Sequence, residues 1–386
     1  MKKVLSIVLN NFIHDSRVLK ECVSLHKAGY DISVLALHDN SEGLAEQEQV
    51  SGIAVHRVRL VSKSWSKNSV VQGLKYLEFI IRAQSDCRKA DILHCNDLNA
   101  LIVGVVAKIM TFGRLQIVYD AHELECEAGA RTRRGKKLLE LAERVTIPFT
   151  NQVITVSPSI AEDYAHRYGI KTPGLVLNAP AWREEILQGD IFRQKYGIRQ
   201  DQKIFLYQGG LTFTRAVKEL IEAFAARQKD DAVLIFMGYG PAEGYIRDAV
   251  AKCEKIFLHP AVLPDEIMQY TCGADYGLIF LHTKGNTSYY YCLPNKLFEY
   301  ATCGLPFLAN DLHDIGNMND KYNMGELVET MSIEGINNGI DKLMARDYQT
   351  LSQNARMMAK AYCWEVQEEN LLEIYGQLTR EMTSQI

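Results

Sequence analysis

Hydrophobic positions along the chain follow two alternating patterns. Short apolar runs have the length of buried parallel strands, at residues 4–9, 32–37, 53–61, 91–95, 115–119 and 152–156. Between them, apolar residues recur at helical spacing, as in residues 17–28, 70–82 and 100–109. Strands that alternate with helices predict an α/β protein with a doubly wound parallel sheet.

The same alternation starts again after a break near residue 180. Asn178-Ala-Pro180 interrupts the pattern, and a charged stretch continues to about residue 200. A second set of strands follows at residues 203–208, 232–237, 256–258 and 274–280, with a helix at 217–226. We therefore expect one Rossmann-like domain over residues 1–180 and another over 181–365. Residues 351–380 have helical spacing, and 366–386 form a terminal helix outside the second domain.

Residues 286–306 combine a polar, aromatic loop with the start of a helix. Pro294 comes just before the helical spacing begins, and Asn295 is a suitable N-cap. Lys296 lies in the first turn and Glu299 one turn later. A helix N-terminus beside a lysine attracts phosphate, and a carboxylate one turn on can accept hydrogen bonds from sugar hydroxyls. An ordinary capped helix with solvated Lys296 and Glu299 explains these residues equally well.

Polar residues gather where the predicted strands of the first domain end. Ligands of doubly wound sheets bind at the carboxyl ends of the strands. His122 follows one strand between Asp120 and Glu123, and it fits either a catalytic or a structural histidine. The other strand ends carry Asn10, Asn11, His14, His94, Asn96, Asp97 and Ser157.

Glycines follow two strands of the second domain. Gly209 and Gly210 precede Arg215, so that open backbone and a guanidinium can approach phosphate oxygens. Gly238 follows the next strand and also permits close approach of a ligand. A tight glycine-rich turn with a solvated arginine is the simpler explanation of each motif taken alone.

Composition narrows the class of protein. Hydrophobic residues make up 47% and charged residues 23%, as in ordinary soluble proteins, and no apolar run is long enough to span a bilayer. The nine cysteines include no C-x-x-C pair, which predicts reduced thiols, a cytoplasmic location and no structural zinc. A net charge of −4 argues against nucleic acid as a partner.

Several cofactor motifs are missing from the sequence. No G-x-G-x-x-G follows the first strand, which argues against a dinucleotide-dependent dehydrogenase, and no P-loop is present. No Asp-x-Asp pair supports an obligatory metal. The basic run Arg131–Lys137 is either a solvated helix face or a contact for an anionic membrane or a phosphate-bearing acceptor.

Together these segments resemble the family 4 glycosyltransferases, which are retaining enzymes of the GT-B fold. In the first half the resemblance rests on residues 15–18, 91–97, 119–124, 156–159 and 178–180. In the second half it rests on residues 207–211, Arg215, 237–241, 293–300 and 304–306. Their order and spacing over almost the whole chain are more specific than any single motif.

The resemblance implies two Rossmann-like domains that face each other across a cleft, with the terminal helix crossing back to the first domain. The second domain would hold the nucleotide sugar. Glu299 would bind the ribose, and Lys296, Arg215 and the helix start at Asn295 would bind the diphosphate. The backbone around Val262 would meet the base, near the glycine turns at Gly209, Gly210 and Gly238.

By the same resemblance, His122 and Glu123 would lie at the reacting sugar, as catalytic residues. The acceptor side would include Asn11, His14, Arg17 and Asp97. Two positions depart from the family pattern. Tyr291 stands where the first glutamate of the E-x7-E motif is expected, and Gly210 stands where an arginine is common. These departures affect the contacts expected for the donor sugar.

We thus expect a retaining enzyme that moves a sugar from a UDP- or GDP-sugar to a glycan or lipid-linked acceptor, in cell-surface polysaccharide or glycoconjugate synthesis. The nucleotide sugar is its co-substrate, and no further cofactor is expected to be obligatory. The protein is expected in the cytoplasm, with peripheral contact at the inner membrane face through Arg131–Lys137. A nucleotide-sugar epimerase or hydrolase, or a catalytically silent homologue, remains open.

Overall fold

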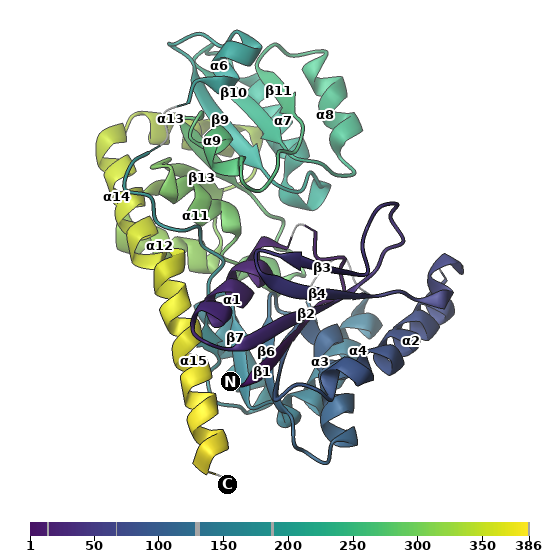
Figure 1. Cartoon of the computed structure of the whole chain (residues 1–386). Coiled ribbons are helices and arrows are strands. Elements are labelled where there is room, and N and C mark those ends of the chain that lie inside the picture. Colours follow the sequence, from purple (N-terminus) through teal and green to yellow (C-terminus); the bar gives the residue numbers. More distant parts are fainter. Residues whose placement is uncertain (14, 67, 128–131, 187–188, 385–386) are drawn as a thin grey trace. The chain divides into compact units, whose positions relative to one another are not determined.

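A computed structural model describes residues 1–386 except 14, 67, 128–131, 187–188 and 385–386 (Figure 1). The chain divides into two compact units. Unit 1 contains residues 1–176 and 368–386, and unit 2 contains residues 177–367. The boundaries expected from the sequence were residues 180 and 365.

Unit 1 is built on an eight-stranded sheet. The neighbouring strands are parallel except for β3 and β4, which form an antiparallel hairpin at one edge. In spatial order the strands are β3 (Gln47–Val50), β4 (Ile53–Val58), β2 (Asp31–Leu37), β1 (Lys3–Ile7), β5 (Ile92–Asn96), β6 (Gln116–Ala121), β7 (Gln152–Thr155) and β8 (Gly174–Leu175).

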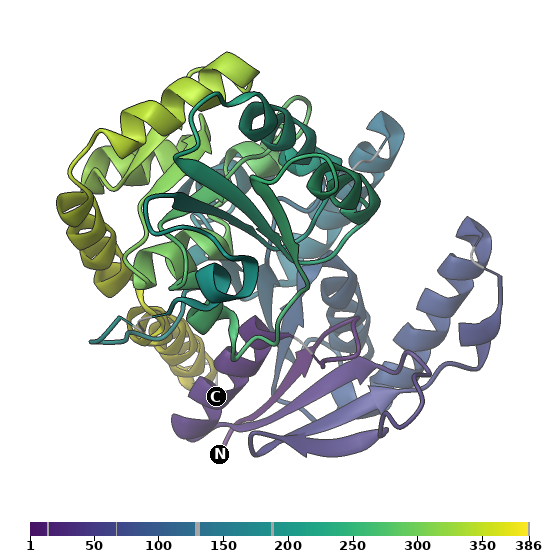
Figure 2. The same cartoon turned by 90° about the horizontal axis from the view of Figure 1, so that it is seen from above.

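Helices cover both faces of this sheet. With right-handed crossovers, a connecting helix lies on one face of the sheet when the chain steps toward one edge, and on the other face when it steps toward the opposite edge. The step from β1 to β2 goes toward the β3 edge, so α1 (Ser16–Lys27) lies on one face. The other face carries α2 (Ser69–Cys87), α3 (Asp97–Met110), α4 (Arg133–Thr146) and α5 (Pro158–Tyr168). Within this layer α3 contacts both α2 and α4. In Figure 2, α2 is the blue helix at the margin of unit 1.

The terminal helix α15 (Trp364–Ser384) begins in unit 2 and packs in unit 1 from residue 368 onward. The Tyr375 hydroxyl lies 2.8 Å from His94 Nδ1, and its ring meets Tyr30 edge to face. A methyl group added at Gly174 would lie 2.5 Å from the Ile374 side chain. The helix is therefore a packed part of the first unit.

Unit 2 contains a six-stranded, fully parallel sheet. In spatial order its strands are β11 (Ile256–His259), β10 (Ala232–Met237), β9 (Lys203–Gln208), β12 (Tyr276–Ile279), β13 (Phe307–Asn310) and β14 (Gly325–Val328). Alternate residues of these strands enter different cores: Leu206 and Ile235 pack on one side, and Phe205 and Phe236 on the other. Burial on both faces explains why these strands read as continuous apolar runs.

The helices of unit 2 complete the two layers. The longer ones are α7 (Val217–Ala226), α8 (Glu243–Val250), α11 (Asn295–Thr302), α12 (His313–Tyr322), α13 (Ile333–Met344) and α14 (Tyr348–Tyr362). The shorter ones are α6 (Ile191–Tyr196), α9 (Ile267–Thr271) and α10 (Thr287–Tyr290). Among the helices of the described residues, none has the length and apolar composition needed to cross a bilayer.

The structure corrects several details of the sequence prediction. The helix expected over residues 351–380 is two helices, α14 and α15, with a break at Cys363. The strand expected over residues 53–61 ends at Val58. Asn295 is not the N-cap of α11. The extended residue Pro294 takes that position without a side-chain cap, and Asn295 is the first helical residue.

Candidate active site

The turns after β9 and β10 pack backbone against backbone. Gly209, Gly238 and Gly240 have φ angles of +112°, +152° and +156°. A methyl group at Gly238 would lie 2.0 Å from the Gly209 carbonyl oxygen, and one at Gly240 would lie 2.4 Å from that of Leu211. Only glycine fits this approach. The two turns therefore form a surface of bare backbone at the carboxyl ends of two central strands.

Two cationic side chains converge on the glycine turn. The Lys296 ammonium lies 3.6 Å from the centroid of the Tyr207 ring. A methyl group placed on Gly209 would lie 3.6 Å from Arg215 Nη1 and 4.0 Å from Lys296 Cε, and one on Gly210 would lie 3.3 Å from Arg215 Nη1. The 3₁₀ turn Phe213–Arg215 and the start of α11 thus bring both cations over the same backbone.

Lys296 and Arg215 are two cations with little negative charge around them. Lys296 is 8% exposed, and burial together with the charge of Arg215 holds its pKa well below the usual value, against the smaller effects of Glu299 and Cys292. Burial lowers the pKa of Arg215, but interactions with Tyr207, Tyr289 and Cys292 raise it overall. Within the described part of the chain, neither cation forms an ion pair with a carboxylate. A bound polyanion would supply the missing charge.

Glu299 lies one turn after Lys296, and its direction is set by neighbouring elements. Its carboxylate accepts a hydrogen bond from the Gln208 side-chain amide at the end of β9. The Gln208 amide oxygen in turn accepts a hydrogen bond of 2.8 Å from the Thr271 hydroxyl on α9. Asn295 is exposed at the first position of α11, so the N–H groups of that turn are accessible to a ligand.

The remaining donor-side predictions differ in what surrounds them. Val262 is half-buried and packs against the core below the loop that follows β11. Tyr291, which stands in place of the family glutamate, follows α10. Its ring centroid lies 5.5 Å from that of Tyr290 and 5.8 Å from that of His313. An aromatic cluster thus stands where a carboxylate was expected.

In unit 1 the functional side chains centre on Asp120 at the end of β6. Arg17 of α1 donates to both oxygens of its carboxylate, at 2.8 Å from Nη2 and 3.2 Å from Nε. His122 Nε2 lies 3.0 Å from Asp120 Oδ2. Asp120 is fully buried; burial raises its pKa, but Arg17 and His122 hold that pKa well below its ordinary value. The carboxylate therefore stays ionised between two cationic groups.

His122 sits between two carboxylates. Besides Asp120, its Nδ1 lies 3.5 Å from Asp97 Oδ1, and its backbone N–H donates to the same oxygen at 3.3 Å. Burial lowers the pKa of His122, but Asp120 and Asp97 outweigh that effect and raise it to about 9. The side chain is 21% exposed. At neutral pH it is thus an accessible imidazolium that can donate a hydrogen bond.

Behind Asp120 lies a second set of buried polar groups that the sequence analysis did not identify as a cluster. Glu21 Oε1 is 3.1 Å from Arg17 Nη2, and Glu21 Oε2 is 3.5 Å from His94 Nε2. Burial raises the pKa of Glu21, which favours its neutral form. The available signal was that Glu21 follows Arg17 by four residues on a predicted helix, which places both on one face.

Glu21, His94 and Asp120 also have the spacing of metal ligands, because their ligand atoms lie within 4.8 Å of one another. The Arg17 guanidinium already lies against both carboxylates of this group, at 3.1 Å and 2.8 Å. A divalent cation would have to share these oxygens with a guanidinium in contact with them. The ion pairs of Arg17 with Glu21 and Asp120 therefore account for this cluster.

The predicted acceptor-side residues have different environments. Arg17 is a correction: its guanidinium is buried, and besides Asp120 it donates to the Val176 carbonyl at 2.8 Å, so it does not present itself at an open turn. Asn11 donates to Asp39 at 2.6 Å. Asp97 lies beside His122. His14 falls outside the described residues.

The catalytic pair expected from the sequence was His122 with Glu123. Glu123 is exposed beyond the end of β6. The buried carboxyl in this segment is that of Glu125, whose pKa burial and the neighbouring Asp97 raise to about 9. Glu125 thus interacts with Asp97, which lies beside His122. The catalytic role expected for Glu123 stays a prediction.

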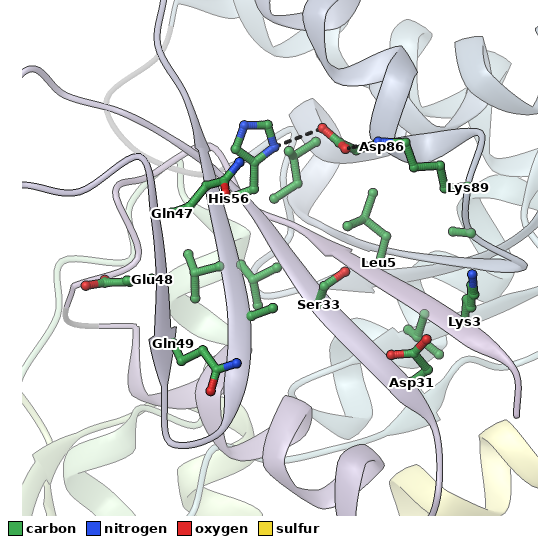
Figure 3. A pocket seen from close by; sticks show the side chains of 16 residues that line it. Lys3, Leu5, Asp31, Ser33, Gln47, Glu48, Gln49, His56, Asp86 and Lys89 are labelled. Atoms are coloured by element: carbon green, nitrogen blue, oxygen red, sulfur yellow. Dashed lines mark hydrogen bonds and ion pairs between the residues drawn. The ribbon is translucent and has the colours of Figure 1, made fainter.

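A cavity of about 490 Å³ lies elsewhere in unit 1 (Figure 3). It is lined by β1 to β4 and by the end of α2, with His56 Nδ1 bonded to Asp86 at 2.9 Å. Lys3 and Asp31, at its wall, are the first residues of β1 and β2. The cavity is thus at the amino ends of the strands, whereas Asp120 and His122 lie at the carboxyl end of β6.

Two family models match the chain. The model described as Glycosyltransferase Family 4 matches residues 16–176, and the model described as Glycosyl transferases group 1 matches residues 189–362. The chain is 26% identical over 242 residues to the uncharacterized glycosyltransferase MJ1607 of Methanocaldococcus jannaschii. That match covers 58% of this chain and 58% of the relative, which is little more than half of its length.

Solved structures agree over almost the full length. Sucrose-phosphate synthase from Thermosynechococcus elongatus superposes with a TM-score of 0.80 at 16% identity, covering 99% of this chain and 100% of that one. Anabaena HepE in complex with UDP-glucose gives a TM-score of 0.74 at 14% identity, covering 98% and 100%. At these identities the likeness shows the fold. With the two family models, it shows that the chain belongs to the GT4-like glycosyltransferases of the GT-B fold.

Proposed function

We propose that this protein is a retaining glycosyltransferase that moves a sugar from a UDP- or GDP-sugar to a glycan or lipid-linked acceptor in cell-surface polysaccharide or glycoconjugate synthesis. The observation that carries the proposal is the pair of cations over the bare backbone of Gly209, formed by the buried Lys296 and the half-buried Arg215. A nucleoside diphosphate has the charge and size to fill this place. HepE, a protein of the same fold, has been crystallised with UDP-glucose.

The remaining donor contacts follow from the geometry of unit 2. Glu299 is oriented by Gln208 and can accept hydrogen bonds from the ribose hydroxyls. The first turn of α11 at Asn295 offers N–H groups to the phosphates. The loop that contains Val262 is available to the base.

In the reaction, the bond between the anomeric carbon and the donor phosphate breaks, and the anomeric carbon forms a bond to an acceptor hydroxyl. The hydroxyl proton passes to the departing diphosphate on the same face of the sugar. Negative charge accumulates on the diphosphate as the bond breaks, so Arg215 and Lys296 stabilise the transition state more than the bound donor. The His122 imidazolium would orient the transferred sugar through a hydrogen bond.

The decisive experiment removes one charge. Lys296→Met should lower kcat with a competent donor by about a hundred- to a thousandfold, as removal of a preorganised charge from a reacting site commonly does. Lys218→Met is the matched control, because Lys218 lies on α7 of the same unit with an exposed side chain. Thermal-shift titrations with UDP and GDP, before and after Glu299→Gln, identify the base and test the ribose contact. Equal turnover by the two lysine variants would reject the proposed diphosphate site.

A catalytically silent homologue or an epimerase is the alternative, motivated by Tyr291 in place of the family glutamate. Incubating donors without an acceptor separates the cases. Isomerised sugar identifies an epimerase, and free sugar identifies a hydrolase. Retained nucleotide binding without transfer, over a panel of acceptors, identifies a silent protein.

A further inference from the structure

The outer face of α2 carries an apolar stripe from Val70 to Ile81. Val70, Leu74, Leu77 and Ile81 are 75%, 48%, 51% and 65% exposed. Their spacings of four, three and four residues place them on one stripe of the helix. Phe79, buried against unit 1, points to the opposite side of the helix. A helix at a water-exposed margin normally shows polar residues on this side.

The outer face of α4 repeats this arrangement and adds charge. Leu138, Leu141 and Val145 are exposed at spacings of three and four residues. The opposite side holds the buried Glu143. The start of α4 belongs to the basic run, and there Arg133, Arg134 and Lys137 are exposed. Among the described residues none of these three cations forms an ion pair, whereas Arg144 in the last turn pairs with Glu140 at 3.6 Å.

Between these two helices, the end of α3 contributes a third group of exposed apolar side chains. Ile109 and Met110 close the helix, and Phe112 in the following turn is 99% exposed. Phe112 has a φ of +54°, a conformation that is unfavourable for a bulky residue, and it projects the ring into solvent. Since α3 contacts both α2 and α4, the three groups belong to one helical layer (Figure 1).

Both acidic side chains of α2 are paired with basic neighbours. Glu78 of α2 pairs with Arg82 at 2.7 Å, and Asp86 pairs with Lys89 at 3.0 Å. On α4, Glu140 is paired with Arg144 and Glu143 is buried, so the unpaired charge on the outer face of that helix is positive. Singly exposed apolar residues need no explanation, but stripes gathered on neighbouring helices mark an interaction surface.

We propose that the outer face of the α2–α3–α4 layer docks on the surface of an anionic lipid bilayer. Helices that lie in a bilayer interface have an apolar stripe flanked by lysine and arginine, with aromatic or leucine side chains that enter the acyl boundary. Anionic headgroups complement the unpaired cations of α4, and Phe112 with the leucines supplies the inserting groups. The inference deepens the proposed function by naming the surface at which a lipid-linked acceptor would be met, and to that extent it rests on that function.

The charge contribution can be tested with vesicles and a double variant. The full-length protein should co-sediment with vesicles of phosphatidylcholine and phosphatidylglycerol in equal parts, more weakly at high salt and on phosphatidylcholine alone. Arg134→Gln combined with Lys137→Gln should reduce the partition coefficient about thirtyfold, since each cation near such a surface contributes about fivefold. The matched control is Lys27→Gln with Lys252→Gln, which removes the same charge at exposed positions away from the layer.

The apolar contribution has its own variant. Leu138→Gln, Leu141→Gln and Val145→Gln together should reduce binding at least tenfold, whereas Leu263→Gln with Met357→Gln should leave it unchanged, because both control residues are exposed in unit 2. Wild-type protein that does not bind anionic vesicles, or variants that bind like their controls, would overturn the proposal. A dimer in sedimentation velocity that only the α4 variant dissociates would do so too, by showing a contact between copies. Vesicle binding needs neither donor nor acceptor, so this result is independent of the transfer assay.

Discussion

Raising the pH from about 6 to about 10 should discharge His122 and weaken unit 1. In the folded protein the pKa of His122 is about 9, against an ordinary value of 6.5, because Asp120 and Asp97 outweigh the effect of burial. The difference of about 2.5 corresponds to about 3.4 kcal/mol at about 1.4 kcal/mol for each pH unit. Since the side chain is 21% exposed, we expect water to reduce this contribution to about 2–3 kcal/mol.

The direction follows from the raised pKa. The stabilisation is complete below the pKa of the unfolded chain, near 6.5, and it disappears as the pH rises through about 9. His122→Gln lacks the titrating group. The difference in free energy of unfolding between the wild type and this variant should therefore shrink by about 2–3 kcal/mol from about pH 6 to about pH 10.

Two measurements check this expectation. Urea unfolding at a series of pH values gives the difference in stability, with circular dichroism as the signal. NMR of the protein labelled at its histidine rings gives the pKa directly, and the resonance missing from His122→Gln identifies the residue. Titration of His122 near 6.5, or stability curves that stay parallel across the pH range, would refute the electrostatic account of the Asp120–His122–Asp97 group.

Three further substitutions test other parts of the structure. Glu21→Gln should change the free energy of unfolding by less than about 1 kcal/mol at neutral pH, because burial favours the neutral carboxyl; a loss of 3 kcal/mol or more, the usual cost of breaking a buried ion pair, would show that Glu21 is ionised. Gly238→Ala should lower the melting temperature by about 5 °C and weaken nucleotide binding, since its methyl group would lie 2.0 Å from a carbonyl oxygen. An unchanged melting temperature in calorimetry would contradict the close approach of the two turns. Glu143→Leu should lower the free energy of unfolding by about 3 kcal/mol or more, because the Glu143 carboxylate accepts hydrogen bonds from three tyrosine hydroxyls at 2.6, 2.5 and 2.6 Å. An unchanged free energy in chemical denaturation would mean that these hydroxyls find other partners.

The local elements of unit 2 were largely predictable. The strands at residues 203–208 and 232–237 and the helix at 217–226 have the bounds that the sequence pattern indicates. Each is a continuous apolar run or a helical spacing that ends at a polar residue or a glycine. The antiparallel β3 was missed because Gln47–Val50 is polar and mostly exposed, so that no face of it shows the alternation of a buried strand.

The donor site was predictable in its parts and not in its assembly. The spacing of Lys296 and Glu299 on a helix, and the glycines after two strands, are local facts. The contact of Lys296 with Tyr207, and the position of Arg215 over Gly209 and Gly210, depend on which strands are neighbours. Strand order follows from packing over the whole sheet.

By itself, the sequence determined the alternation of strands and helices, the division into two α/β units, the glycine turns and the family of the chain. The tertiary structure decided which groups became electrostatic partners. Arg17 and Asp120 are 103 residues apart, and His94 and Tyr375 are 281 residues apart. Apolar periodicity records only whether a residue faces the interior. The environment that ionises Asp120, charges His122 and exposes the apolar stripe of α4 exists only once the parallel sheet brings distant segments together.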